Sequence, residues 1–245
     1  MIDPIMMMNA KKFTFSDNYT EAVMSLQPEV YTETRRIIES ELANFSVRHG
    51  QKPVVLDIGA AGLMPYDSSL AEKITVVDLF PRPGGINLPE NASWVIADIL
   101  SDSALSKLRA EKYDFIIMSN LLHHLCDARN NSKKHLAICM QNSRVLLSEN
   151  GRIYIFESLC SRFMSRLQDA LYPAYSFILK KLLKFSFVRM FSFREIEEAV
   201  SNCGMKMEPL YFKQPKNIAQ VFWRVPLKFY PLRLYAIAVF RGADE

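Results

Sequence analysis

Five short apolar runs follow one another through the first two thirds of the chain, and they constrain the fold more than any other feature. They span residues 54–59, 74–80, 94–99, 113–120 and 152–158. Each run is continuously apolar rather than alternating, which is typical of a strand buried on both faces of a sheet. Stretches with helical character lie between them, at residues 66–72, 103–111 and 133–148. Strands that alternate with helices predict a doubly wound, mostly parallel α/β sheet with helices on both faces.

The segments around these runs extend the pattern. Residues 14–48 and 192–203 have the spacing of helices, and residues 205–212 and 234–241 have strand character. The pair Asn150-Gly151 is typical of a helix stop, so we expect it to separate the preceding helix from the fifth strand.

Length and composition together suit one packed domain. About half of the 245 residues are apolar (49%) and 23% are charged, which excludes a disordered chain. We divide it into an N-terminal helical segment (1–50), a cofactor-binding core (51–160), a helical cap insertion (161–191) and a C-terminal helix with strands (192–245). Four cysteines without a CxxC pair indicate a reducing, cytoplasmic setting, and no metal site is expected. No apolar run is long enough to span a bilayer, while peripheral contact at the inner membrane surface stays open.

Small and acidic residues end the apolar runs. In an open parallel sheet, ligands bind beyond the carboxyl ends of the strands. The first run leads into the turn Asp57-Ile58-Gly59-Ala60-Ala61-Gly62, whose small residues allow a ligand to approach the backbone. Asp78 follows Gly59 by 19 positions, the spacing at which an acid binds both hydroxyls of a ribose. Asp98 could accept a hydrogen bond from the amine of an adenine, so a nucleoside cofactor is expected here.

The turn also indicates which cofactor. It lacks the GxGxxG pattern of dinucleotide-binding proteins, and Asp57 would repel a pyrophosphate, whereas it suits a ligand with an ammonium group. At this point the chain resembles the class I S-adenosylmethionine-dependent methyltransferases, over residues 50–160 and in outline over 192–241. The segments that carry the resemblance are VVLDIGAAG, VVDLF, IADIL, YDFIIMSNLLHHL and LLSENGRIYIFES. The turn departs from the family pattern, because Ala61 and Leu63 occupy positions that are usually glycine and Gly62 is displaced.

The resemblance implies a seven-stranded sheet with an antiparallel last strand and S-adenosyl-L-methionine as the cofactor. The cofactor-binding residues that it implies are Asp57, Gly59, Ala60, Ala61 and Gly62 for the methionine part, Asp78 for the ribose, Leu79, Asp98 and Ile99 for the adenine, and Asn120 and Leu121 near the sulfonium.

Two adjacent histidines follow the fourth run. His123 or His124 could act as the base that removes a hydroxyl proton from a methyl acceptor, and the sequence offers no ground for choosing between them. Alternatively, one of them caps a helix or packs under the sheet. Glu157, at the end of the fifth run, is a candidate to contact the acceptor.

The insertion carries the positive charge of the chain. Residues 161–194 contain one acid before Arg194, Asp169, and a series of basic residues interleaved with aromatic and aliphatic ones. The basic residues are Arg162, Arg166, Lys180, Lys181, Lys184, Arg189 and Arg194. We expect a helical stretch, interrupted at Pro173, that closes over an acceptor with Tyr172 and Tyr175 as contacts, or lies on an anionic membrane. The plain alternative is a cap helix with a solvated basic face.

These features favour a methyltransferase (EC 2.1.1.-) that O-methylates a small or lipid-like, amphipathic acceptor. A nucleic-acid methyltransferase is the nearest alternative, although residues 119–122 lack the Pro-Pro-aromatic element of enzymes that methylate base amines. An inactive partner subunit that binds the cofactor is a second alternative, and a nicotinamide enzyme is a third.

Overall fold

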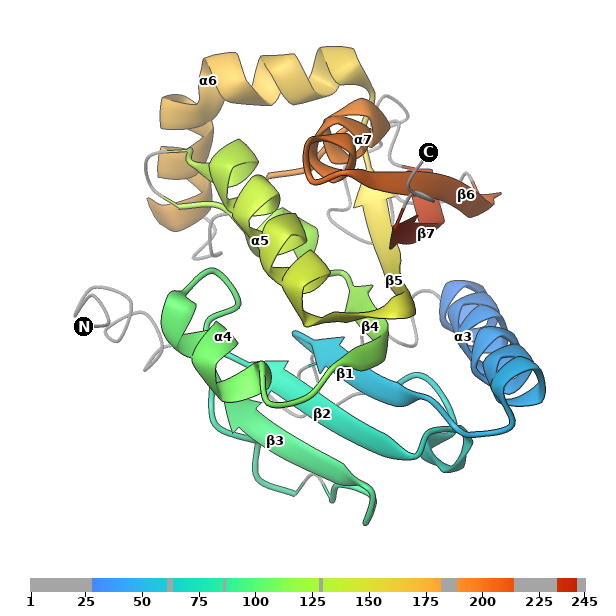
Figure 1. Ribbon diagram of the computed structural model, residues 1–245. Coiled ribbons are helices and arrows are strands. Elements are labelled where there is room, and N and C mark those ends of the chain that lie inside the picture. The colour runs from blue at the N-terminus through green and yellow to red at the C-terminus, as the bar shows by residue number, and fades with distance from the viewer. Residues whose placement is uncertain are drawn as a thin grey trace.

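The computed structural model describes residues 28–60, 64–85, 87–127, 130–181, 189–213 and 233–241. Within these ranges, seven strands form one sheet in the order β3-β2-β1-β4-β5-β7-β6 (Figure 1). They are β1 (Val54–Ile58), β2 (Lys73–Asp78), β3 (Ala92–Ile96), β4 (Tyr113–Ser119), β5 (Leu147–Leu159), β6 (Met205–Lys213) and β7 (Arg233–Arg241). Strands β1 to β5 are parallel, and β7 runs antiparallel to both of its neighbours. The predicted mostly parallel sheet with an antiparallel last strand is therefore confirmed.

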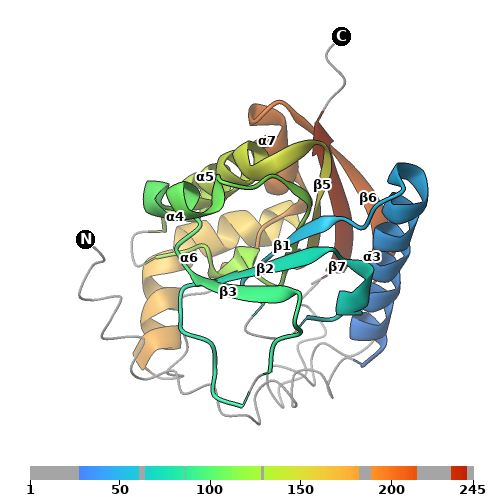
Figure 2. The ribbon, with the colours of Figure 1, turned by 60° about the horizontal axis from the view of Figure 1, so that its bottom comes forward.

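Helices cover both faces of this sheet (Figure 2). Helix α3 (Pro28–His49) packs on one face, and helices α4 (Asp102–Leu108), α5 (Ser132–Leu146) and α7 (Phe193–Asn202) pack on the other. Successive residues of a strand face opposite sides. In β1, Val55 accordingly packs with α3, whereas Leu56 joins the core under α5. Burial on both faces explains why the strands read as continuous apolar runs.

The expected helix stop at Asn150-Gly151 is wrong. Helix α5 ends at Leu146, and β5 begins directly at Leu147 and runs through both residues. The pairing of β5 with β4 shifts register here, so the pair lies in an irregular part of the strand. A Cβ atom on Gly151 would lie 2.8 Å from the Leu147 side chain. The glycine therefore allows a close approach within the strand rather than ending a helix.

The helix expected at residues 66–72 is also wrong. Only the short 3-10 helix η1 (Ser68–Leu70) forms there. Its start is fixed by Asp67, whose side chain accepts a hydrogen bond from the Ser69 N–H at 2.9 Å. Tyr66, just before it, is buried and donates its hydroxyl to Asp57 at 3.0 Å. This contact attaches the segment to β1.

Helix α6 (Arg162–Lys181) follows β5 and forms most of the described part of the insertion. Pro173 lies inside it without ending it, so the expected interruption is wrong. A proline removes one hydrogen bond of the helix and bends it. Figure 1 shows α6 changing direction along its length, as a bend of this kind requires.

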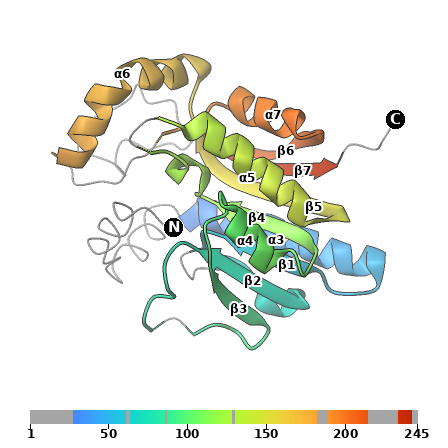
Figure 3. The ribbon, with the colours of Figure 1, turned by 60° about the vertical axis from the view of Figure 1, so that its left-hand side comes forward.

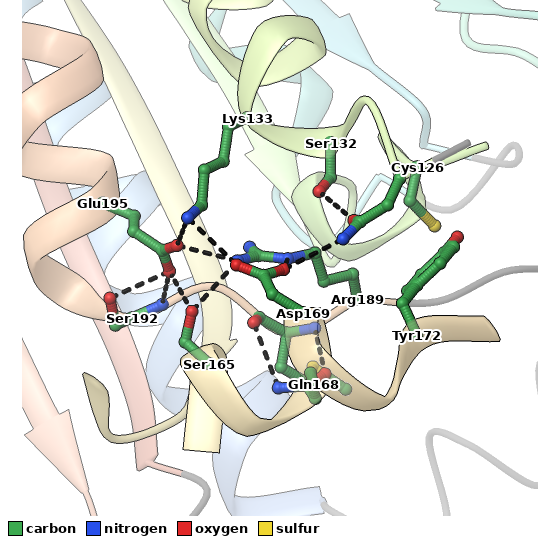
Figure 4. Close-up of polar contacts among 12 residues, drawn as sticks. Cys126, Ser132, Lys133, Ser165, Gln168, Asp169, Tyr172, Arg189, Ser192 and Glu195 are labelled. Carbon is green, nitrogen blue, oxygen red and sulfur yellow. Dashed lines mark hydrogen bonds and ion pairs between the residues drawn. The ribbon is translucent and has the colours of Figure 1, made fainter. Parts of the chain in front are cut away.

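A buried ion-pair cluster attaches α6 to the domain, and Figure 4 shows it. We call it the Arg189 cluster: Arg189, Asp169, Glu195, Lys133 and Ser165. The fully buried Arg189 side chain donates through Nε to Asp169 at 2.7 Å and through Nη2 to Glu195 at 2.7 Å. Lys133 lies 3.0 Å from Asp169 and 3.3 Å from Glu195. Because these residues come from α5, α6, α7 and the segment before α7, the cluster joins three helices.

We predict that Asp169→Ala lowers the free energy of unfolding by about 3 kcal/mol, since it removes one partner of a buried guanidinium. Glu198→Ala is the matched control, because Glu198 pairs with Arg194 at 3.0 Å on the surface. Exposed pairs of this kind contribute less than about 1 kcal/mol. Urea unfolding of both variants measures the difference, and equal losses would show that the Arg189 cluster contributes no more than a surface pair.

Candidate functional site

The ends of β1 to β5 meet at one edge of the sheet, as parallel strands require. Backbone hydrogen bonds join neighbouring ends. The Gly59 N–H donates to the Val77 carbonyl at 2.8 Å, beside Asp78, and the Asp78 carbonyl accepts from the Ala97 N–H at 2.9 Å, beside Asp98. Further along, the Asn120 N–H donates to the Phe156 carbonyl at 2.8 Å, beside Glu157. The predicted strand-end residues therefore form a single row.

The turn after β1 needs a glycine. Gly59 has a φ of +73°, in the left-handed region that favours glycine. A Cβ atom added to it would lie 2.7 Å from Cδ1 of Leu121, so Leu121 packs directly on this turn. Ala60 is buried beside it. The predicted cofactor-binding residues Ala61 and Gly62 lie outside the described residues.

Asp57 is a buried acid at the end of β1. The residue is 1% exposed, and its carboxylate accepts the Tyr66 hydroxyl at 3.0 Å. Burial raises the pKa of Asp57 to about 7, and the hydrogen bond from Tyr66 opposes part of that rise. Tyr66 was not predicted, because nothing in its sequence position distinguishes it from a core tyrosine.

Asp78 is the last residue of β2, and its carboxylate accepts the Phe80 N–H at 3.1 Å. Leu79 beside it is 48% exposed and presents an apolar surface at the strand end.

The expectation that Asp98 ends the third strand is wrong. Strand β3 ends at Ile96, and Asp98 lies in the following turn, where its carboxylate accepts the Leu100 N–H at 2.9 Å. Ile99 is buried in the core, and its carbonyl accepts the side-chain amide of Asn142 at 2.7 Å. The two residues still lie at the same edge of the sheet, but in a turn that the Asp98 carboxylate stabilises.

His123 and Glu157 form a hydrogen-bonded pair at this edge. Nδ1 of His123 lies 2.8 Å from the buried Glu157 carboxylate, which also accepts the Ser158 N–H at 2.8 Å and the His123 N–H at 3.3 Å. Burial alone would raise the pKa of Glu157, but His123 and these N–H groups hold the pKa below its usual range. An ionised Glu157 can only accept a hydrogen bond, so Nδ1 of His123 carries the proton of this contact. In a neutral imidazole the lone pair is then on Nε2.

His124 lies next to this pair rather than in it. The ring centroids of His123 and His124 are 4.1 Å apart. Desolvation of the ring and the neighbouring His123 lower the pKa of His124 from its ordinary value, although the residue keeps an exposed surface. The backbone carbonyl of His123 accepts the Arg189 N–H at 3.0 Å, which links the turn with both histidines to the Arg189 cluster.

The basic insertion differs from the expectation in one respect. Arg189 is buried between acids, and Arg194 pairs with Glu198, so neither belongs to a free basic face. Tyr172 is buried, and its hydroxyl donates to the Asp127 carbonyl. The side chain of Tyr175 and residues 182–188 lie outside the described residues. Within the described ranges, no group of three or more His, Cys, Asp or Glu side chains could hold a metal ion.

We predict that Asp57→Asn stabilises the protein increasingly as the pH rises. In the native protein, the folded state binds the Asp57 proton more tightly than the unfolded state, where the pKa of Asp57 is 3.8. The stability that this proton gives the native protein is therefore complete below pH 3.8 and is lost as the pH rises through about 7. Asparagine keeps an acceptor for Tyr66 without titrating. Urea unfolding at pH 5 and pH 8 should show the variant gaining about 3 kcal/mol relative to the native protein between these two pH values.

Asp67→Asn is the control, because the pKa of Asp67 is lowered by the Ser69 N–H and this exposed acid is already ionised at pH 5. A constant difference between Asp57→Asn and the native protein across the pH range would contradict the account of Asp57.

Comparison with known proteins supports the architecture. No family model matches the sequence, and no curated protein sequence matches it. Solved structures do match the fold. One is the N-methyltransferase NodS from Bradyrhizobium japonicum WM9 in complex with S-adenosyl-L-homocysteine, with 18% identity, a TM-score of 0.50, and coverage of 84% of this chain and 87% of that chain. Another is the YcgJ protein from Bacillus subtilis, with 14% identity, a TM-score of 0.53, and coverage of 83% and 100%. The chain therefore has the fold of class I S-adenosylmethionine-dependent methyltransferases.

Proposed function

We propose that the protein is an S-adenosylmethionine-dependent methyltransferase (EC 2.1.1.-) that O-methylates a small or lipid-like, amphipathic acceptor. The observation that carries this proposal is the placement of the His123–Glu157 pair in the row of strand ends, within a methyltransferase fold. A base with an orienting carboxylate suits an acceptor that must lose a proton, such as a hydroxyl group.

The strand-end residues fit the proposed cofactor. Asp78 offers a carboxylate for two ribose hydroxyls, and the exposed Leu79 offers apolar surface for an adenine. Gly59, whose positive φ favours glycine, lets the Leu121 side chain pack directly on the turn after β1, so both residues line the same strand end. Burial raises the pKa of Asp57, and its hydrogen-bond donor, the Tyr66 hydroxyl, carries no positive charge. The ammonium group of the cofactor would supply that charge to the Asp57 carboxylate.

The other cofactor-binding residues that we propose follow from the same row. They are Ala60, Ala61 and Gly62 in the first turn, Asp98 and Ile99 after β3, and Asn120 with Leu121 after β4. S-Adenosylmethionine supplies a methyl group on a sulfonium, which transfers in line to a nucleophile held close to it.

We assign the base to His123. Glu157 holds Nδ1 of the ring, and the Arg189 N–H holds the backbone carbonyl of the same residue, so the ring and the turn that carries it are both positioned. Nε2 then takes the proton of the acceptor hydroxyl, and the Glu157 carboxylate stabilises the positive charge that forms on the ring. Glu157 therefore acts as a positioning residue in this proposal, rather than as a contact to the acceptor.

Nucleic acid is a less supported acceptor. The buried pairing of Arg189 and the surface pairing of Arg194 remove two charges from the basic insertion that the sequence indicates. Phosphate recognition depends on such charges.

We predict that the protein binds S-adenosylhomocysteine with micromolar affinity and does not bind NAD. Asp78→Ala should weaken binding by about 1–3 kcal/mol, since it removes hydrogen bonds to a charged group. Glu111→Ala is the control, because Glu111 pairs with Lys73 at the opposite end of β2. Isothermal titration calorimetry measures the affinity of the native protein and of both variants for S-adenosylhomocysteine. Native protein that releases no heat with S-adenosylhomocysteine would refute the cofactor proposal.

We also predict that His123→Ala lowers turnover by about 10²–10⁴-fold while leaving affinity for S-adenosylhomocysteine nearly unchanged, because the base acts on the acceptor. Glu157→Gln should lower turnover in the same way, whereas His124→Ala should retain most of it. The assay measures transfer of labelled methyl groups from S-adenosylmethionine to a panel of hydroxylated amphipathic compounds. Full turnover in His123→Ala would mean that the acceptor needs no base from this residue, and cofactor binding without transfer to any acceptor would favour the inactive partner subunit.

A further inference from the structure

Helix α6 carries its apolar side chains on the outside. Phe163 is 71% exposed, Leu171 is 52% exposed, and Leu167 between them is also exposed. Residues four apart lie on the same face of a helix, so these three form one line, which we call the α6 stripe. Exposed large apolar side chains that gather in one place mark an interaction surface.

The buried side of the same helix is mostly polar, with Tyr172 as its one large buried ring among the described side chains. Ser165, Gln168 and Asp169 face the domain, where Ser165 and Asp169 belong to the Arg189 cluster and Gln168 accepts the Met190 N–H at 3.1 Å. A surface helix normally buries its apolar face and exposes its polar face. In α6 this arrangement is reversed, so the core of the domain does not account for the α6 stripe.

The charge on the exposed side is basic. Arg162 and Arg166 are exposed and lie beside the α6 stripe. Asp169 is the one acid in the sequence of α6, and it is directed into the Arg189 cluster (Figure 4). The outward side therefore combines apolar and cationic side chains, the combination found in helices that lie in the interface of an anionic bilayer.

We infer that the α6 stripe with Arg162 and Arg166 binds the surface of an anionic lipid bilayer. The apolar side chains would enter the headgroup region and the arginines would contact lipid phosphates. A second copy fits less well, because a symmetric contact would gather Arg162 and Arg166 of both copies in one interface, and the one acid of α6, Asp169, is directed into the Arg189 cluster. In the described part of the chain, no helix is long and apolar enough to cross a membrane, so the contact would be peripheral.

The position of α6 connects this surface with the site. Figure 3 shows α6 on the outside of the domain, beyond the end of β5, the strand that carries Glu157. The Arg189 cluster joins α6 to the carbonyl of His123. If the methyltransferase function proposed above holds, the bilayer would present an amphipathic acceptor beside the catalytic edge; this consequence rests on that function, whereas the bilayer contact does not.

Vesicle flotation of the full chain without cofactor tests the contact. We expect binding to vesicles of phosphatidylcholine with phosphatidylglycerol, weaker binding at high salt, and little binding to phosphatidylcholine alone. The double variant Phe163→Glu, Leu171→Glu should lose at least about tenfold in affinity. Arg162→Gln should lose about fivefold on anionic vesicles.

Val47→Glu is the matched control, because Val47 is a large apolar residue that is 85% exposed on α3, away from α6 (Figure 1). It should bind vesicles like the native protein. No flotation of the native chain, or equal losses in the control and the stripe variant, would overturn the inference. A native dimer that the stripe variant dissociates in analytical ultracentrifugation would assign the α6 stripe to a second copy instead. Calorimetry with S-adenosylhomocysteine, carried out separately, distinguishes failure of this inference from failure of the proposed function.

Discussion

The buried guanidinium of Arg189 is the interaction on which the arrangement of the site depends. A buried charge requires partners that compensate the loss of water, and Asp169 and Glu195 supply them from α6 and α7. This requirement fixes α6 against the domain with its polar side inward. The backbone of the same arginine binds the carbonyl of His123, so the helix outside the core and the histidine in the site are positioned by one residue.

The site itself follows from the geometry of a parallel sheet. Five strands that run in one direction bring their carboxyl ends to one edge. Acids lie at the ends of β1 and β2 and in the turn after β3, while His123 in the turn after β4 pairs with Glu157 of β5. A nucleoside part and a reacting part of a ligand can therefore be bound side by side by residues far apart in the sequence.

The sheet could be predicted from the sequence because strands buried on both faces leave continuous apolar runs. The residues at the ends of β1, β2, β4 and β5 were predictable for the same reason, since they lie at the ends of such runs, whereas Asp98 lies in a turn beyond its strand. Contacts made through space were not predictable. Gly151 looks like a helix stop, yet its close approach to Leu147 belongs to a strand. Arg189 looks like one more basic residue of the insertion, and only the fold shows it between two acids.

The central claim is that the strand-end row binds the nucleoside and directs the reacting centre toward His123. A crystal structure of the chain with S-adenosylhomocysteine tests this most directly. The account predicts ribose hydroxyls hydrogen-bonded to the Asp78 carboxylate and the sulfur on the side of the ligand that faces the His123–Glu157 pair. A ligand bound away from Asp78, or with its sulfur directed away from His123, would contradict it.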